Sequence, residues 1–538
     1  MTPRPNILFI MADQLRWDYL SCYGHPHLET PNIDRIARQG VRFDRVYCQA
    51  PLCGPSRASI YSGRYMSSCG VYWNSDPVPI GNKMLGDYLR PLGYRTMLVG
   101  KSHFRPDRAG MERLGIDLNS PTGQLLAQGG FEPFDRDNGI RSDEILAARG
   151  PSQYDHYLRE LGYDAHNPWD RNANGVLDDE GNFASGWFYE NAPRPANIAE
   201  EHTETPYMTR RAIDCIEAMG DEPWCIHLSY IKPHWPYIAP APYHNMYGPA
   251  DMLPRNAVPE ELADPHPVYR AFADQLVSRS FSEDEVREMV VPVYMGLVKQ
   301  LDDQIGVLLD YLEGTGRMAN TFIVFCSDHG DYLGDHWLGE KDNFHDEAAK
   351  VPLLIYDPSP AADDTRGKSV DALVEMIDLV PTFVELAGGQ AEEHSHILEG
   401  ASLRGWLHGE FPDGWRTSAV SEIDFSGRSP RQDLGLTAAE SRGYMLRTER
   451  WKYLLWEGFG CQLFDLEQDA HELVDLGRHP DYAVIRGQLK DNLFTWLRRR
   501  KNRVATPTAQ AEKNSPQNDE SEGVLMGYWR AGDFRPPE

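Results

Sequence analysis

Cys53 opens a segment whose residue types and spacing suit it for chemistry, Cys-Gly-Pro-Ser-Arg at residues 53–57. Pro55 suits the first turn of a helix and Gly54 permits a tight entry into it, so Cys53 is expected at a helix N-terminus. Arg57 lies one turn further on, and its guanidinium can fold back toward Cys53. The backbone N–H groups at such a terminus favour anions. A structural cysteine that only precedes a helix is the alternative interpretation.

Polar side chains follow four apolar segments of strand length, at residues 6–11, 96–99, 225–230 and 321–326. These segments alternate with helical patterns, which is typical of a mostly parallel α/β sheet. Sites in such sheets form beyond the carboxyl ends of the strands, because these ends share one edge. We therefore expect the residues that follow these strands to meet near Cys53: Asp13, Gln14, Lys101, His103, His234, Asp328 and His329.

Four of these residues form an oxygen-rich set with one imidazole: Asp13, Gln14, Asp328 and His329. Such a set suits a divalent cation, and its single imidazole and neutral amide favour Mn²⁺. For each residue taken alone, a cap at the end of a strand is the alternative interpretation. Lys101 and His103 are two residues apart on a segment expected to be extended, so their side chains can face the same way.

The composition indicates an ordinary globular protein of 538 residues with one large core and a smaller companion domain. Its formal net charge of −28 disfavours binding to nucleic acid or to an anionic membrane surface. Eight cysteines without a C-x-x-C pair are typical of reduced thiols rather than of disulfides or a zinc cluster. With no signal peptide and no apolar run of transmembrane length, we expect a cytoplasmic protein.

The chain divides at about residue 390 into two differently patterned parts. Residues 1–390 predict an α/β domain with a large mixed, mostly parallel sheet sandwiched by helices, including a further strand at 352–356. Residues 391–504 predict a subdomain on an antiparallel sheet, with strands near 419–423, 444–447 and 452–456 and a helix at 482–500. The polar extension 505–538 retains Val524, Met526 and Trp529, which indicates an oligomer contact; a frayed end is the alternative.

The run C-x-P-S-R with its following glycine resembles the signature of type I sulfatases, in the alkaline phosphatase superfamily. The chain also resembles the bacterial arylsulfatase and phosphonate monoester hydrolase group. Residues 469–476 resemble a block of sulfatase C-terminal subdomains, with Ala470 and Asp475 where proline and asparagine are usual. The resemblance therefore covers most of the chain, and it implies that Cys53 is oxidised after synthesis to Cα-formylglycine.

The resemblance implies a metal site made by Asp13, Gln14, Cys53, Asp328 and His329. Many members carry a second aspartate where this chain has Gln14. The phosphonate monoester hydrolases also lack that aspartate. The wider sulfatase pattern favours Ca²⁺, so Mn²⁺ and Ca²⁺ both stay open.

The resemblance also gives roles to basic residues. Lys101 and His103 would hold the formylglycine hydrate and the substrate oxygens, with His103 as the base that acts last. His234 and Lys341 would bind the ester oxygens and assist the leaving group, and Arg57 would stabilise negative charge. One hydroxyl of the hydrate would attack sulfur or phosphorus and expel the alcohol, after which the hemiacetal would collapse and release sulfate.

We thus expect a hydrolase of aryl or alkyl sulfate monoesters that also accepts phosphonate monoesters and phosphodiesters. A dedicated phosphonate monoester hydrolase is the nearest alternative, and a non-catalytic metal-binding relative is a more distant one. The expected partners are a small anionic ester, a formylglycine-generating maturation enzyme and further copies of the chain in a homodimer or homotetramer.

Two other features are given structural interpretations. Residues 170–175 open like a calcium-binding EF-hand loop, but position twelve is Gly181, so we expect a polar turn in an insertion over the site. His336 and His345 receive no role in the chemistry.

Overall fold

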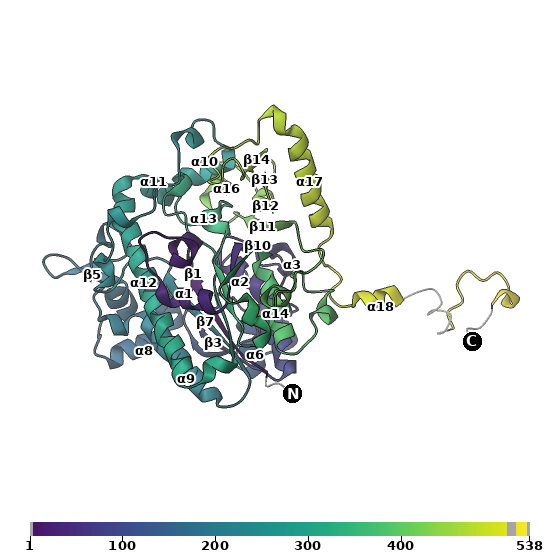
Figure 1. Ribbon diagram of the computed structural model, residues 1–538, viewed down its shortest axis with the longest axis horizontal. Coiled ribbons are helices and arrows are strands. Elements are labelled where there is room, and N and C mark those ends of the chain that lie inside the picture. The colour runs from purple at the N-terminus through teal and green to yellow at the C-terminus, as the bar shows by residue number, and fades with distance from the viewer. Residues whose placement is uncertain (1–3, 514–522, 535–538) are drawn as a thin grey trace.

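The computed structural model describes residues 4–513 and 523–534, so the predicted extension is described only in part. Its main feature is an eight-stranded sheet in the order β10-β2-β9-β8-β1-β7-β3-β4 (Figure 1). All neighbouring strands pair in parallel except β9, which runs antiparallel to β8 and β2. The strands are β1 (Asn6–Asp13), β2 (Val41–Tyr47), β3 (Arg95–Gly100), β4 (Glu132–Arg136), β7 (Trp224–Pro233), β8 (Thr321–Ser327), β9 (Leu353–Tyr356) and β10 (Lys368–Glu375).

The central strands are apolar throughout because both of their faces are covered. In β1, Leu8 and Ile10 belong to one hydrophobic cluster while Ile7 and Phe9 belong to another, as the two-residue period of a strand requires. Helices α1 (Pro31–Gln39), α9 (Glu204–Met219) and α12 (Asp284–Gly314) pack on the first face, and α2 (Cys53–Ser62), α4 (Leu85–Leu89) and α14 (Leu379–Leu386) on the second. The predicted sandwich of helices around a mostly parallel sheet is confirmed.

A second, four-stranded antiparallel sheet follows in the C-terminal part, as predicted. It is a meander of β11 (Ser418–Asp424), β12 (Arg442–Thr448), β13 (Trp451–Trp456) and β14 (Cys461–Asp465), followed by helix α17 (Ala483–Arg498). A buried ion pair joins it to the large sheet, because Arg416, just before β11, contacts both Glu375 of β10 and Asp378.

The segment that resembles an EF-hand loop differs in detail from the expected turn. Residues Trp169–Ala173 form a short helical turn, and Gly175 begins a hairpin of β5 (Gly175–Leu177) and β6 (Phe183–Ser185). Trp187, just after this hairpin, packs against Trp235 with ring centroids 5.7 Å apart.

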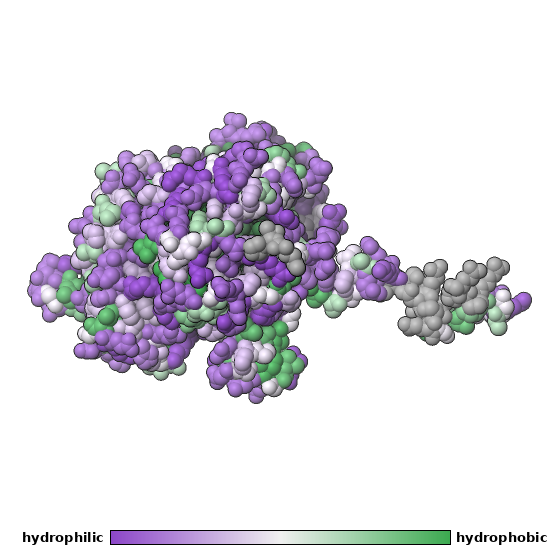
Figure 2. Space-filling model, turned by 60° about the horizontal axis from the view of Figure 1, so that its bottom comes forward, coloured by the Kyte–Doolittle hydropathy of each residue, from purple (hydrophilic) through white to green (hydrophobic). Residues whose placement is uncertain are grey.

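The outer surface is mainly hydrophilic on the face shown in Figure 2, as the net charge leads one to expect. Helix α18 (Thr508–Lys513) leads away from the globule (Figure 1), and beyond it Met526 and Trp529 are 87% and 85% exposed. Within the described residues, the structure contains no helix with the length and apolarity needed to cross a membrane.

At Gly100, the end of β3 packs closely against β7. Its φ of +98° is left-handed, and a Cβ there would lie 2.1 Å from the carbonyl oxygen of Ser229. Gly435 is also left-handed, at +68°, but has open space around it. We expect Gly435→Ala to cost about 1–2 kcal/mol of unfolding free energy from backbone strain alone.

We expect Gly100→Ala to cost about 1–3 kcal/mol more than this control, because β3 must also move away from β7. Denaturant unfolding of both variants measures the difference. Equal costs would show that the close contact between Gly100 and Ser229 is not required.

Candidate metal centre and active site

The four predicted strand ends meet at one edge of the sheet. Asp13 is the last residue of β1, and Asp328 and His329 directly follow its neighbour β8. On the other side of β1, His234 directly follows β7, and Lys101 directly follows β3. The register pairs Ala12 with Ser327 and Gly100 with Ser229, so these ends are level with one another.

Four side chains at this edge form a compact cluster, with the ligand atoms of Asp13, Cys53, Asp328 and His329 all within 4.8 Å of one another. Cys53 Sγ lies 3.0 Å from His329 Nε2 and 3.6 Å from Asp13 Oδ1. His329 Nδ1 donates to the carbonyl oxygen of Gly330 at 2.9 Å, which leaves Nε2 as the free, acceptor nitrogen. Two carboxylates and an imidazole held in this way fit a divalent cation.

Gln14 lies beside the cluster with a left-handed backbone (φ +63°). Its backbone N–H donates to Asp328 Oδ1 at 3.1 Å, and its side-chain N–H donates to Asp331 Oδ2 at 2.6 Å. Its amide oxygen accepts from Lys341 Nζ at 2.7 Å. The structure thus brings Gln14 and Lys341 to the cluster, while the role of Gln14 as a metal ligand stays a prediction.

Buried cations balance the carboxylates. Lys101 Nζ forms an ion pair with Asp13, and Arg57 Nε forms another with Asp328 Oδ2 at 2.7 Å. Burial alone would raise the pKa of Asp13, but the charges of Lys101, His234 and Arg57 hold it well below its ordinary value. Arg57 also donates to the backbone oxygen of Lys101, and its Nη2 lies 3.7 Å from Asp13 Oδ2.

Helix α2 presents Cys53 to the cluster at its N-terminus. Cys53 is its first residue, as predicted, and every residue of the helix is buried. Ser56 Oγ donates to the backbone oxygen of Asp328 at 2.6 Å, and Gly54 N–H donates to Asn74 Oδ1 at 2.8 Å. Burial and the charge of Asp13 raise the pKa of the Cys53 thiol to about 12. An unmodified thiol there is therefore a poor nucleophile near neutral pH.

The two remaining histidines, His103 and His234, differ in their surroundings. His103 has a left-handed backbone (φ +57°), so the expected extended arrangement of Lys101 and His103 is wrong: β3 ends at Gly100. The ring of His103 still lies among the charges of the site, and its Nδ1 is buried without a hydrogen-bond partner among the described residues. Burial and the charge of Lys101 hold its pKa well below the ordinary value, which keeps the ring neutral.

His234 is fixed by its backbone neighbour and by an aromatic wall. Its Nδ1 donates to the carbonyl oxygen of Trp235 at 2.6 Å, which leaves Nε2 free. The ring centroids of His234 and Trp235 are 4.2 Å apart, and Lys341 Nζ lies 5.7 Å from the Trp235 ring. Since Trp187 packs on Trp235, the segment after the β5–β6 hairpin reaches the edge of the site, as the predicted insertion requires.

The sequence analysis missed three residues that support the site. Ser229 accepts from Arg57 at 2.7 Å, Asp331 accepts from Gln14 and Tyr237, and Asn74 binds the start of α2. Asp331 carried a usable signal, since it lies two residues after His329. Ser229 lies within an apolar strand and Asn74 in a loop, and neither position stands out by type or spacing.

Comparison with known proteins agrees with this geometry. Residues 5–389 match the sulfatase family, and residues 334–499 match the C-terminal region of N-sulphoglucosamine sulphohydrolase. The multifunctional alkaline phosphatase superfamily protein PehA of Trinickia caryophylli is 29% identical, over 94% of this chain and 97% of its own length. The choline-sulfatase of Rhizobium meliloti is 28% identical, over 91% of this chain and 85% of its own.

Among solved structures, the phosphonate monoester hydrolase SpPMH from Silicibacter pomeroyi is similar with a TM-score of 0.80 and 28% identity. That match covers 92% of this chain and 96% of the other. The sequence motif, the fold and the family match all agree. The chain therefore belongs to the sulfatase family, in the alkaline phosphatase superfamily, and is a sulfuric ester hydrolase.

Proposed function

We propose that the protein hydrolyses sulfate monoesters of aryl or alkyl alcohols through a formylglycine formed from Cys53, together with one divalent metal ion, Mn²⁺ or Ca²⁺. Side activity on phosphonate monoesters and phosphodiesters is part of the proposal. The observation that carries it is the cluster of Asp13, Cys53, Asp328 and His329, in which residue 53 directly faces the candidate metal ligands.

The site is arranged to receive an anion although the chain as a whole repels one. Three buried cations lie at the site, Arg57, Lys101 and Lys341, together with the carboxylates of Asp13, Asp328 and Asp331. A metal held by Asp13, Gln14, Asp328, His329 and residue 53 would add positive charge and act as a Lewis acid toward the ester. Lys101 and Lys341 have further N–H donors for the sulfuryl oxygens, since each ammonium carries three.

The residues of the chain account for the covalent steps. A formylglycine hydrate at residue 53 would supply one hydroxyl oxygen for attack at sulfur, its proton being released to water as the metal lowers the pKa of that hydroxyl. Lys341, beside His234, can supply a proton to the alcohol oxygen as the S–O bond to the alcohol breaks. His103, held neutral with a free Nδ1, then takes the proton of the second hydroxyl. The C–O bond to sulfate breaks, so sulfate leaves and the aldehyde returns.

A dedicated phosphonate monoester hydrolase is the second candidate. It is supported by Gln14, which removes one negative charge from the metal site, and by the similarity to SpPMH. The basic pair Lys101 and His103 favours sulfate, because a sulfuryl oxygen accepts from N–H donors where the carbon substituent of a phosphonate cannot.

The proposal includes the protein's setting and domain organisation. All eight cysteines are free, which fits a reducing cytoplasm that also contains a formylglycine-generating enzyme. We place the catalytic domain at 1–390, the C-terminal subdomain at 391–504 and an oligomer contact at 505–538. The exposed Met526 and Trp529 of this extension suit a homodimer or homotetramer.

Replacing Asp328 tests the metal assignment. We expect Asp328→Asn to lower metal content from about one ion per chain and to reduce activity about 100-fold or more, because it removes a charged ligand. Elemental analysis measures the content and also identifies Mn²⁺ or Ca²⁺. The matched control is Asp357→Asn, which breaks another buried pair, 3.0 Å from His408, away from the cluster. Unchanged metal content in Asp328→Asn would falsify the assignment.

Replacing Cys53 tests the nucleophile. Peptide mass spectrometry of protein made with a maturation enzyme is expected to find the aldehyde or its hydrate at residue 53. Cys53→Ser keeps one hydroxyl but lacks the second, so we expect a trapped covalent sulfate or no turnover. Full activity in protein that contains only the unmodified thiol would contradict the mechanism.

Exchanging Lys101 and His103 for threonine tests the choice between sulfate and phosphonate. We expect the ratio of kcat/KM for sulfate to kcat/KM for phosphonate to fall roughly 10-fold, since donors that match the sulfuryl oxygen are lost. Loss of His103 as a base affects both substrates, so the ratio, with phosphonate as internal control, is the quantity to measure. Equal losses would place selectivity elsewhere, for instance in Trp187 and Trp235.

A further inference from the structure

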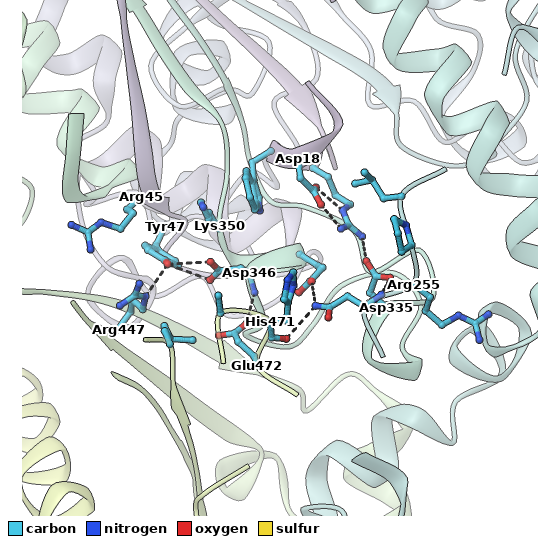
Figure 3. A pocket seen from close by; sticks show the side chains of 18 residues that line it. Asp18, Arg45, Tyr47, Arg255, Asp335, Asp346, Lys350, Arg447, His471 and Glu472 are labelled. Atoms are coloured by element: carbon cyan, nitrogen blue, oxygen red, sulfur yellow. Dashed lines mark hydrogen bonds and ion pairs between the residues drawn. The ribbon is translucent and has the colours of Figure 1, made fainter. Parts of the chain in front are cut away.

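A cavity of about 710 Å³ lies between the large sheet and the C-terminal sheet. Arg45 and Tyr47 of β2 line it together with Arg447 of β12 (Figure 3). Lys350, just before β9, also lines it. None of the residues assigned above to the metal, the nucleophile or the substrate lines this cavity. It is therefore a compartment separate from the catalytic centre, and its volume is in the range of small-molecule sites.

Two cations in this cavity have no carboxylate partner. Arg447 is only 6% exposed, its Nε donates to Tyr47 Oη at 3.1 Å, and its Nη1 is buried without a hydrogen-bond partner among the described residues. Lys350 Nζ lies 3.6 Å from the centre of the Trp17 ring. Within the described chain, neither side chain has a carboxylate oxygen within 4.0 Å. A buried guanidinium is stable only when its donors are satisfied by water or by a ligand.

Four acidic residues of the cavity are already ion-paired, two with each of two cations. Arg16 binds both Asp18 and Asp335, and Lys452 binds both Asp346 and Glu472. Tyr47 Oη, which accepts from Arg447, donates to Asp346. Asp346 and Glu472 are thus already engaged by Lys452, and neither Lys350 nor Arg447 forms an ion pair with them among the described residues.

The neighbouring group of His336, Glu347 and Glu472 has the spacing of a metal site but already contains its cations. Besides Lys452 at Glu472, His336 lies between Glu261 and Glu347, with its Nδ1 2.7 Å from Glu261. These contacts make the group a buried ion-pair network, which agrees with the structural interpretation of His336. The unpaired positive charge lies instead at the end of the cavity formed by Tyr47, Lys350 and Arg447 (Figure 3).

We propose that this end of the cavity is a second anion site, which binds the carboxylate, phosphate or sulfate group of a small molecule between Arg447 and Lys350. Guanidinium and ammonium groups are the usual donors to such oxyanions, and the hydrogen bond to Tyr47 holds the Arg447 guanidinium in a fixed orientation. The cavity is larger than a single tetrahedral anion, so it has room for the organic part of an acid. Because Arg447 belongs to β12 of the C-terminal sheet and Lys350 lies just before β9 of the large sheet, a bound ligand would bridge the two parts of the chain.

Crystals soaked in selenate locate the site by anomalous scattering, and the catalytic centre provides an internal control. We expect wild-type crystals to show one peak at the catalytic centre and one between Arg447 and Lys350. Arg447→Gln should lose only the second peak, whereas Arg404→Gln, at an exposed arginine, should keep both. If Arg447→Gln does not fold, Lys350→Met, which keeps Arg447, replaces it. A wild-type cavity without a peak, or a peak unchanged in both cavity variants, would overturn the proposal.

Calorimetric titration of the full-length, metal-loaded protein with sulfate, phosphate and citrate tests binding in solution. We expect binding at two sites in wild type and about 10- to 100-fold weaker binding at one of them in Arg447→Gln, because a charge-assisted hydrogen bond is lost. Tighter binding of citrate would indicate an organic acid as the ligand, and tighter binding of sulfate would indicate the reaction product. A selenate peak without saturable binding in solution would mean an adventitious ion only, and the proposal would fail. None of these results depends on activity at Cys53.

Discussion

Two carboxylates buried at the ends of neighbouring strands set the constraint that the rest of the site satisfies. Asp13 ends β1 and Asp328 follows β8, and both are fully buried. Charges removed from water are tolerated only when partners are close and their remaining hydrogen bonds are made. Lys101 after β3 and Arg57 of α2 supply these partners. The site therefore depends on the order and register of the sheet, which bring three strand ends and one helix to the same point.

The same arrangement explains how a strongly acidic protein can act on an anion. The net charge of −28 is that of the whole chain, while the catalytic edge brings together the buried cations Arg57, Lys101 and Lys341. Field lines in a low-dielectric cleft are concentrated, so a few buried cations dominate the local potential. In the proposed function, the substrate is selected by the N–H donors of Lys101 and His103 on one side and by the rings of Trp235 and Trp187 on another.

Much of the fold could be predicted because the central strands are continuously apolar. β1, β7 and β8 were found within three residues at either end, and the residues after them were those that the structure brings together. β2 was missed because charged residues interrupt its apolar ones. α12 was missed because Pro292 lies inside it. Packing of α12 against α9 and β7 overrides the propensity of proline to end a helix. The antiparallel direction of β9 depends on long-range pairing that no local pattern encodes.

The residue types of the site could also be predicted, but the local backbone turns and the ion pairs between these residues could not. Strand ends and the motif at residues 53–57 were enough to select Asp13, Asp328, His329 and Cys53. The left-handed turn at His103 could not be foreseen, since position 103 carries neither the glycine nor the asparagine that usually marks such a turn. The ion pair of Lys101 with Asp13 likewise depends on two strands more than 80 residues apart in the chain, joined through β7.

The most direct test of the account is a crystal structure of the matured protein with its metal, with anomalous scattering recorded at wavelengths chosen for manganese and calcium. The account predicts one metal peak roughly 2.0–2.6 Å from ligand atoms of Asp13, Gln14, Asp328, His329 and residue 53. It also predicts an aldehyde hydrate at residue 53, with one oxygen toward that peak. A metal bound among His336, Glu347 and Glu472 instead, or none at the ends of β1 and β8, would contradict it.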